Sequence, residues 1–239
     1  MKNIELKQQL KEKLEQLNLQ LSDKQLDLLL KYKNLVLEWN EKINLTAIKE
    51  DEEFINKHLV DSLTICKYIE EGAKMIDIGT GAGFPGIPVK IATNTDITLF
   101  DSLNKRLKVL DNIIKVLNLS EIKTLHGRAE ETFKNKEYRE KFDIATSRAV
   151  ASLNILVELM LPAVKIGGIC ICMKGNNVEE EIEKSKRAIE ILGGKIEKIE
   201  QIDLPNTEIQ RNIVIIRKIK NTPKAYPRKP GTPQKSPII

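Results

Sequence analysis

The 239-residue sequence is poor in cysteine, histidine and aromatic residues, and it has no long apolar run. Aromatic residues make up only 4% of the chain, which favours an aliphatic core over an aromatic platform for stacking. The three cysteines lack C-x-x-C spacing, so we expect reduced core residues in a cytoplasmic protein, and no metal site. Since no stretch of eighteen apolar residues occurs, we expect neither a membrane span nor a signal peptide.

Positive charge is concentrated at the C-terminal end of a chain whose net charge is +5. Residues 211–239 contain eight Lys and Arg and no acidic residue, a pattern that favours a polyanionic partner at this end. The alternative is a solvated tail that aids only solubility. Residues 221–239 contain five prolines and no periodic pattern, so we expect an extended or disordered basic tail. The candidate contacts to a polyanion are Arg211, Lys224, Arg228 and Lys229.

The first 70 residues read as an N-terminal helical extension. Apolar residues recur every three or four positions, and Ser22 with Gln25 predicts a capping box for a second helix. A third helix is expected near residues 51–69, where His58 and Asp61 lie one turn apart. A structural His–Asp contact is the favoured interpretation, and a role in a site is the alternative.

From Lys74 onward, strand patterns alternate with helix patterns, which predicts a parallel sheet with right-handed crossovers. Two final strand-like runs have no helix between them and predict a hairpin. The expected fold is therefore α/β, with a seven-stranded, mostly parallel sheet and an antiparallel last strand over residues 71–220. Strands are expected near 74–79, 96–101, 121–126, 142–147 and 168–174, with helices near 86–93, 103–118, 151–165 and 177–192.

The segment MIDIGTGAGFPG, residues 75–86, reads as a strand, a tight glycine turn and the start of a helix. Asp101 ends the next predicted strand at the same sheet edge, where it could take the ribose hydroxyls of a nucleoside. Asp77, beside the turn, is expected to grip the same ligand. Gly81, Gly83 and Gly86 match the dinucleotide fingerprint G-x-G-x-x-G. In that fingerprint the first glycine directly follows the strand, whereas here the strand ends near Ile78 and the turn begins at Gly79. Pro85 also removes an N–H that a pyrophosphate could have used.

This loop favours S-adenosylmethionine, which has no phosphate and carries an α-amino group that a carboxylate can bind. A nucleotide-dependent oxidoreductase and a glycine turn without a ligand are the alternatives. For an oxidoreductase the proton donors are poor, because His58 and His126 are the only histidines. A non-enzymatic RNA-binding protein is disfavoured because the glycines and Asp101 are intact.

The predicted strand ends also limit the reaction. They carry no N/D-P-P-Y/F motif for amino-group methylation and no cysteine for attack on a pyrimidine ring. A ring nitrogen with a free lone pair, such as N7 of guanine, needs neither device and can attack a sulfonium methyl in line. Arg148, after the fourth strand, would then orient the acceptor or the cofactor carboxylate, and an ordinary ion pair is its alternative role.

Seven segments together resemble the RsmG family of ribosomal RNA small-subunit methyltransferases, formerly called glucose-inhibited division protein B. They are NLTAIKEDEEFINKHLVDSL, MIDIGTGAGFPGIPV, LFDSLNKR, GRAEE, SRAVASL, MKG and RNIVIIRK, in that order. The resemblance implies a Rossmann-like class I methyltransferase fold and transfer of a methyl group from S-adenosylmethionine to N7 of guanine 527, in the 530 loop of 16S ribosomal RNA. The partner is the free RNA, the 30S subunit or its assembly intermediate, and we expect a monomer.

The resemblance also implies residue roles. The cofactor contacts that it implies are Gly79, Phe84, Ala129, Glu130 and Arg148. Asp101 is expected on the ribose from the general fold, and Gly81 is expected to contact the cofactor as part of the glycine loop. From their location in the predicted fold, and not from the resemblance, Arg148 and Lys174 are the candidate catalytic residues, and Lys174, Arg211 and His58 are candidates for reading the base.

Overall fold

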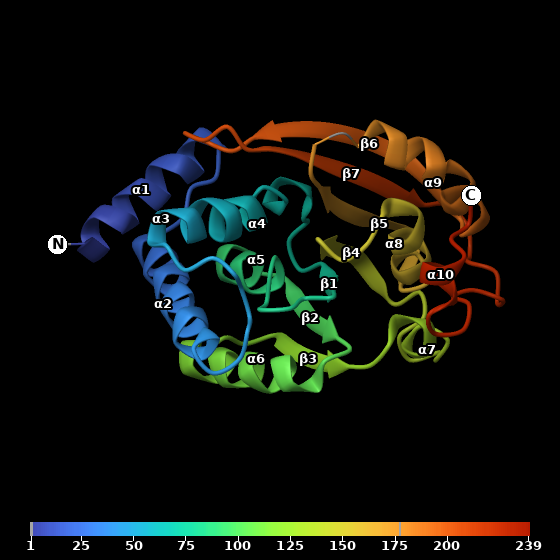
Figure 1. Cartoon of the computed structure of the whole chain (residues 1–239), viewed down its shortest axis with the longest axis horizontal. Helices are drawn as coiled ribbons and strands as arrows, with labels where there is room; N and C mark the ends of the chain where they lie inside the picture. Colours follow the sequence, from blue (N-terminus) through green and yellow to red (C-terminus); the bar gives the residue numbers. More distant parts are fainter. Residues whose placement is uncertain (1, 177) are drawn as a thin grey trace.

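The computed structural model describes residues 2–176 and 178–239 (Figure 1). Helices α1 (Lys2–Gln16) and α2 (Asp23–Asn40) open the chain, and the predicted capping box at Ser22 is confirmed. The third predicted helix is divided into four short pieces because a π-helical segment interrupts it. These pieces are α3 (Asp51–Phe54), the π-helical η1 (Ile55–Val60), α4 (Asp61–Leu63) and the 3-10 turn η2 (Cys66–Tyr68).

The seven-stranded sheet has the order β3-β2-β1-β4-β5-β7-β6, as expected for the class I methyltransferase fold. The first five strands pair in parallel, and β7 runs antiparallel between β5 and β6. The predicted final hairpin is therefore confirmed. The strands are β1 (Lys74–Ile78), β2 (Asp96–Asp101), β3 (Ile122–His126), β4 (Phe142–Arg148), β5 (Val164–Lys174), β6 (Gly194–Asp203) and β7 (Gln210–Lys218).

The four helices predicted after the first strand are present in the predicted order, and the short α7, between β3 and β4, was not predicted. Helix α8 is shorter than predicted, because the chain turns at residues 161–163 and β5 starts four residues earlier than expected. The early part of β5 pairs with β4 across a register shift between Phe142 and Ile144. The helices are α5 (Gly86–Ala92), α6 (Asn104–Leu117), α7 (Ala129–Thr132), α8 (Leu153–Met160) and α9 (Glu179–Ile191).

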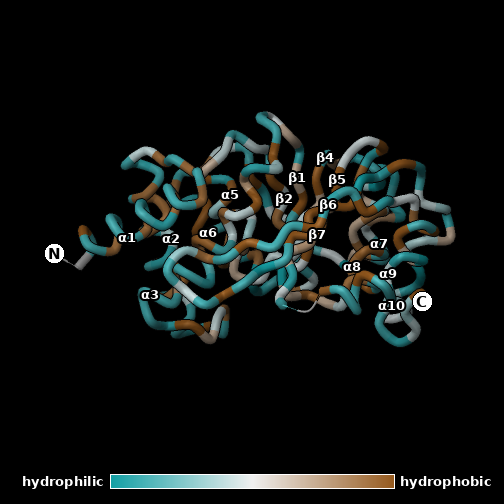
Figure 2. Tube along the Cα trace, turned by 90° about the horizontal axis from the view of Figure 1, so that it is seen from above, coloured by the Kyte–Doolittle hydropathy of each residue, from teal (hydrophilic) through white to brown (hydrophobic). Residues whose placement is uncertain are grey.

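Buried aliphatic side chains form one cluster on each face of the sheet. The N-terminal helices share the first cluster with α5 and α6, and α2 packs directly against both. Helices α8 and α9 cover the other face. Figure 2 shows apolar segments gathered along the central strands and polar segments at the periphery. The helical extension therefore belongs to the same packed body as the sheet. No described helix is long and apolar enough to cross a membrane.

The C-terminal segment, residues 221–239, packs on the body beside α7 and α8 (Figure 1). Its helix α10 (Thr232–Lys235) follows Gly231, and the Arg139 guanidinium donates hydrogen bonds to three tail carbonyls. The Arg228 guanidinium pairs with Glu158, whose side chain is fully buried. The expectation of an extended or disordered tail is therefore wrong, because partners distant in the sequence hold it.

Candidate functional site

The glycine loop begins where β1 ends, as predicted. The backbone N–H groups of Gly79 and Thr80 both donate to the Phe100 carbonyl, at 2.8 and 3.1 Å, so the loop closes over the end of β2. Gly79 has φ +73°, and a Cβ there would lie 2.5 Å from Cγ2 of Val150. Gly81 has φ +60°, but a Cβ there would meet nothing nearer than the Gly79 oxygen at 4.0 Å. The loop therefore presents bare backbone to open space at Gly81.

That open space is a cavity of about 430 Å³ at the carboxyl ends of β1, β2 and β4. It brings together Gly79, Gly81, Phe84, Asp101 and Arg148, five of the residues predicted from the sequence. A second cavity, of about 580 Å³, lies at the opposite edge of the sheet and is lined in part by charged residues that are paired with one another. Ligands of open parallel sheets bind at the carboxyl edge, so the first cavity is the candidate site.

Asp101 lines this cavity and organises its backbone. Its Oδ2 accepts a hydrogen bond from the Gly81 N–H at 3.0 Å, and its Oδ1 accepts one from the Leu103 N–H at 2.8 Å. The Arg106 guanidinium lies 3.8 Å from the same carboxylate. Each carboxylate oxygen keeps a lone pair for a further donor such as a ribose hydroxyl.

Asp77 has a different role from the one expected, because it is fully buried and does not line the cavity. Its Oδ2 accepts hydrogen bonds from the Thr80 hydroxyl at 2.7 Å and the Gly86 N–H at 2.9 Å. Burial raises the pKa of Asp77 to about 7, against these two hydrogen bonds, which lower it. The acid before the loop therefore fixes the loop's shape and does not reach into the candidate site.

Arg148 is the last residue of β4, and its guanidinium turns toward the helical extension. NH1 donates to the Lys57 carbonyl at 2.8 Å and to Oδ2 of Asp61 at 3.0 Å. The guanidinium carbon also lies 5.0 Å from the centre of the Phe84 ring, a cation–π contact. The side chain is thus held on several sides at the cavity wall.

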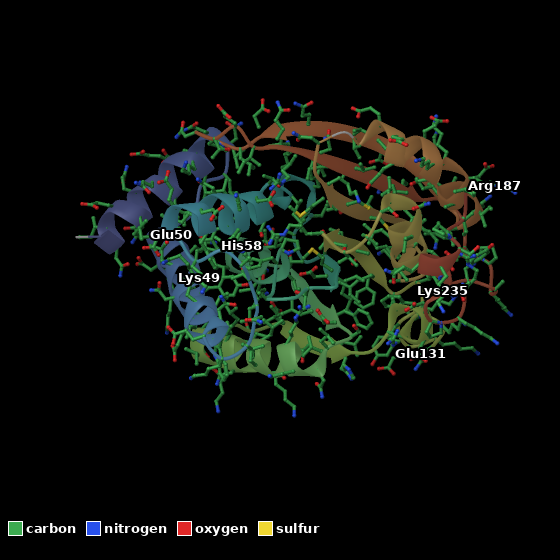
Figure 3. The ribbon with its side chains drawn as sticks, viewed as in Figure 1. Lys49, Glu50, His58, Glu131, Arg187 and Lys235 are labelled. Carbon is green, nitrogen blue, oxygen red and sulfur yellow. The ribbon has the colours of Figure 1, made fainter. Side chains whose placement is uncertain are left out.

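His58 lies toward the middle of the molecule in Figure 3 and lines the same cavity. Its Nδ1 is 3.2 Å from NH2 of Arg148, and since a guanidinium can only donate, Nδ1 is the acceptor. The Nε2–H then donates to the Thr46 hydroxyl at 2.7 Å. Burial, assisted by the Arg148 charge, lowers the pKa of His58 to about 3, so the ring is neutral. His58 and Asp61 thus both contact Arg148, where a direct contact between them was expected.

Other predicted residues lie outside the cavity lining. The Lys174 ammonium donates to the Ala151 carbonyl at 2.9 Å and pairs with Glu181 at 2.7 Å. Ala129 and Glu130 begin α7, and the Glu130 carboxylate accepts the Gly231 N–H at 3.0 Å. The Arg211 Nε donates to Asp61, while Lys224 and Lys229 are exposed. Among the described residues, no group of three or more acidic, His or Cys side chains is placed to hold a metal.

Sequence reasoning missed two residues that shape the loop. The buried Tyr32 hydroxyl donates to the Ala82 carbonyl at 2.7 Å, and its ring meets Phe84 edge-on. Helical periodicity could have placed Tyr32 on the buried face, but no local pattern names its partner. Val150 packs over Gly79 after Ala149, which adopts φ +55°, and this turn has no glycine to announce it.

Comparisons with known structures support the fold. The structure described as M. jannaschii TYW2 in complex with AdoMet superposes with a TM-score of 0.54 at 14% identity, over 66% of this chain and 75% of that chain. The [4+2]-cyclase SpnF gives a TM-score of 0.54 at 13% identity, over 73% of this chain and 84% of that chain. With its strand order and glycine loop, this protein has the Rossmann-like fold of class I methyltransferases.

The particular family follows from the sequence. The family model described as rRNA small subunit methyltransferase G matches residues 25–214. The protein of that name from Clostridium novyi (strain NT) is 52% identical over 94% of this chain and 94% of its own length. That from Alkaliphilus oremlandii (strain OhILAs) is 49% identical over 98% of this chain and 100% of its own length. The chain belongs to the rRNA small subunit methyltransferase G family.

Proposed function

We propose that this protein transfers the methyl group of S-adenosyl-L-methionine to N7 of guanine 527, in the 530 loop of 16S ribosomal RNA. Family membership supports an rRNA methyltransferase, and S-adenosylmethionine is the cofactor of that family and fold. The 530 loop and guanine 527 are what the resemblance to the family's sequence motifs implies, and the chemistry of the cavity supports N7 as the acceptor. The protein acts in the cytoplasm, as a monomer, on the free RNA, the 30S subunit or its assembly intermediate.

The cavity fits the cofactor. At Gly81 the loop presents bare backbone to the cavity, with the Gly79 oxygen at 4.0 Å as the nearest atom to a Cβ there, so a ligand can pass close to the loop at this point. The Asp101 carboxylate at the cavity wall can accept ribose hydroxyls. Phe84 and Arg148 line the same cavity. Ala129 and Glu130, at the start of α7 after β3, are the proposed adenine side.

The observation that carries the N7 assignment is that the two cavity-lining side chains able to act as a base, His58 and Asp101, are already engaged. Both ring nitrogens of His58 are hydrogen-bonded, and each Asp101 oxygen accepts a backbone N–H. The three cysteines of the chain are buried elsewhere, on η2 and β5, and burial raises the pKa of each thiol. The acceptor must therefore attack with a lone pair that needs no deprotonation, as N7 of guanine can.

S-Adenosylmethionine supplies an electrophilic sulfonium methyl group when bound. The protein's own contribution is positioning, because the proposed acceptor, N7 of guanine, attacks with a free lone pair and has no proton to lose. Arg148 would orient the acceptor or the cofactor carboxylate, and Lys174 would support the turn after β4 through its bond to Ala151. No covalent enzyme intermediate forms, and the methyl group passes directly to N7.

The test is transfer of labelled methyl from S-adenosylmethionine to 16S RNA, supplied free and as 30S subunits from cells lacking the modification. The product is mapped by chain cleavage at 7-methylguanine. A single site in the 530 loop is the expected result. Transfer to another base, or none to either form by a protein that binds the cofactor, would contradict the proposal.

Arg148→Ala and Arg217→Ala make a matched pair for this assay. Arg217 pairs with Glu197 at the opposite edge of the sheet, so its loss leaves the cavity untouched. Arg148→Ala is expected to lower methyl transfer far more than Arg217→Ala does at a similar change in melting temperature. Equal effects would show that Arg148 is structural only.

A further inference from the structure

Asp61, the first residue of α4, lies between two arginines that come from separate strands. Its Oδ2 accepts a hydrogen bond from NH1 of Arg148 at 3.0 Å, and its Oδ1 accepts one from Nε of Arg211 at 3.1 Å. The side chain is 3% exposed and does not line the cavity. One buried carboxylate from the helical extension thus joins the ends of β4 and β7.

The two arginines are not equivalent. Arg148 lines the cavity, whereas Arg211 lies outside its lining and also donates to the carbonyl of its neighbour Gln210. The other contacts of Arg148 come from η1 and the glycine loop, through the Lys57 carbonyl, the His58 ring and the Phe84 ring. Among the groups that touch Arg148, Asp61 is the one that carries an opposite charge.

The charges of this cluster require the carboxylate. Two guanidinium groups are always protonated, and the neutral ring of His58 adds no negative charge. An amide in place of Asp61 would keep its shape but would turn N–H donors toward groups that can only donate. The two cations would then repel one another in a poorly solvated place, and Arg148, which has open cavity beside it, would move.

We propose that Asp61 is a positioning residue for methyl transfer, which acts by holding the Arg148 guanidinium at the wall of the cavity. The proposal rests on the function proposed above. It assigns to the helical extension a direct part in shaping the site. Asp61 touches neither cofactor nor acceptor in this role.

The first test compares Asp61→Asn with Asp143→Asn. Asp143 is the matched control because it lies near the start of β4, at the opposite edge of the sheet, where it pairs with Lys165 and accepts the Lys74 N–H. Both variants lose one carboxylate charge from an ion pair, and melting temperatures report the structural part. Asp61→Asn is expected to lower kcat by about tenfold to a hundredfold, since small displacements of positioning groups cost that much. Asp143→Asn is expected to leave kcat within about twofold.

A double-mutant cycle shows whether the effect passes through Arg148. If it does, Asp61→Asn lowers kcat much less in the Arg148→Lys background than in the wild-type protein, because the effects of substituting two residues in contact are not additive. Additive losses in kcat would contradict the proposal. So would equal losses in Asp61→Asn and Asp143→Asn at a similar change in melting temperature.

Calorimetric titration with S-adenosylmethionine gives a readout that needs no RNA. Asp61→Asn and Arg148→Lys are expected to raise the Kd by a similar factor, and Asp143→Asn to leave it unchanged. Wild-type protein that binds the cofactor but methylates no rRNA would overturn the proposed function, while this titration still decides the role of Asp61. An unchanged Kd in Asp61→Asn, with Kd raised in Arg148→Lys, would overturn the inference itself.

Discussion

The imidazole of His58 stacks on the phenyl ring of Phe84, with ring centroids 4.3 Å apart and planes inclined by 14°. His58 belongs to the helical extension, and Phe84 belongs to the glycine loop. Tyr32 reaches the same loop from α2 through its bond to the Ala82 carbonyl. The N-terminal helices therefore support the loop from outside the sheet, and a polar, titratable ring lies within that support.

The neutral state of His58 makes stability depend on pH. Its pKa is about 3 in the folded protein, against 6.5 for an unperturbed histidine, because burial and the Arg148 charge disfavour the imidazolium. The unfolded chain thus binds more protons than the folded protein between these pH values. His58 therefore leaves the free energy of unfolding unchanged with pH above about 6.5 and lowers it as the pH falls from there to about 3, by at most about 1.4 kcal/mol for each pH unit.

Urea unfolding of wild-type protein and His58→Gln between neutral and mildly acidic pH measures this effect. The wild-type advantage in free energy of unfolding is expected to shrink as the pH falls. His126→Gln is the matched control, because His126 is exposed and solvent reaches it in both states. Parallel curves for wild type and His58→Gln would show that His58 is not held neutral by the fold.

Most of the sheet could be predicted from the sequence because its signals are local. Alternating strand and helix patterns, the capping box at Ser22 and the glycines after β1 each act within a few residues. The parallel pairing of the first five strands and the final hairpin followed from whether a helix lies between successive strands, whereas the strand order is seen in the structure. Five residues of the cavity lining were also within reach, because strand ends in such a sheet meet at one edge.

The features that the sequence did not reveal are contacts between residues far apart in the chain. Asp77 was expected to hold a ligand, but it is 0% exposed and holds the loop that follows it. The tail read as unstructured because no periodic pattern reveals the buried Glu158, 70 residues away from Arg228. The sequence likewise does not show that Asp61 meets Arg148 and Arg211, since each comes from a different element.

Replacing Gly81 by leucine is expected to abolish cofactor binding and to leave the fold intact. A side chain there points into open space in the cavity, and the φ of +60° adds a backbone strain of about 1 kcal/mol. Gly167→Leu is the matched control, since Gly167 has φ +86° with no atom near its Cβ position and lies at the opposite edge of the sheet. Both variants should lose similar stability by thermal unfolding, and only Gly81→Leu should lose affinity in calorimetric titration with S-adenosylmethionine. Unchanged affinity would remove the loop from the site.

Arg228→Ala is expected to lower stability before it affects RNA binding. The Arg228 guanidinium and backbone N–H all donate to the Glu158 carboxylate, at 2.7 to 3.1 Å. Without the guanidinium, Glu158 would be a buried charge without a counter-ion, which costs about 3 kcal/mol. Urea unfolding measures this loss, and Lys224→Ala, on the exposed part of the same tail, is the control. A loss no larger than that of Lys224→Ala would mean that the pair adds no stability.

The exposed lysines of the tail are the better candidates for contacts to RNA. The side chains of Lys224 and Lys229 are exposed, and neither ammonium forms a hydrogen bond or ion pair within the described structure. Each could therefore bind an RNA phosphate and release one condensed counter-ion. Replacing both by alanine is expected to weaken binding of a 16S RNA fragment that contains the 530 loop. It should also flatten the plot of log affinity against log salt by up to about one unit for each lysine. Lys11→Ala with Lys24→Ala removes the same charge from exposed positions on α1 and α2, at the other end of the molecule in Figure 1. A larger loss of RNA affinity and a flatter salt dependence in the tail variant than in this control would show that the tail lysines contact RNA locally. Equal salt dependences in the two variants would show that the tail has a structural role alone.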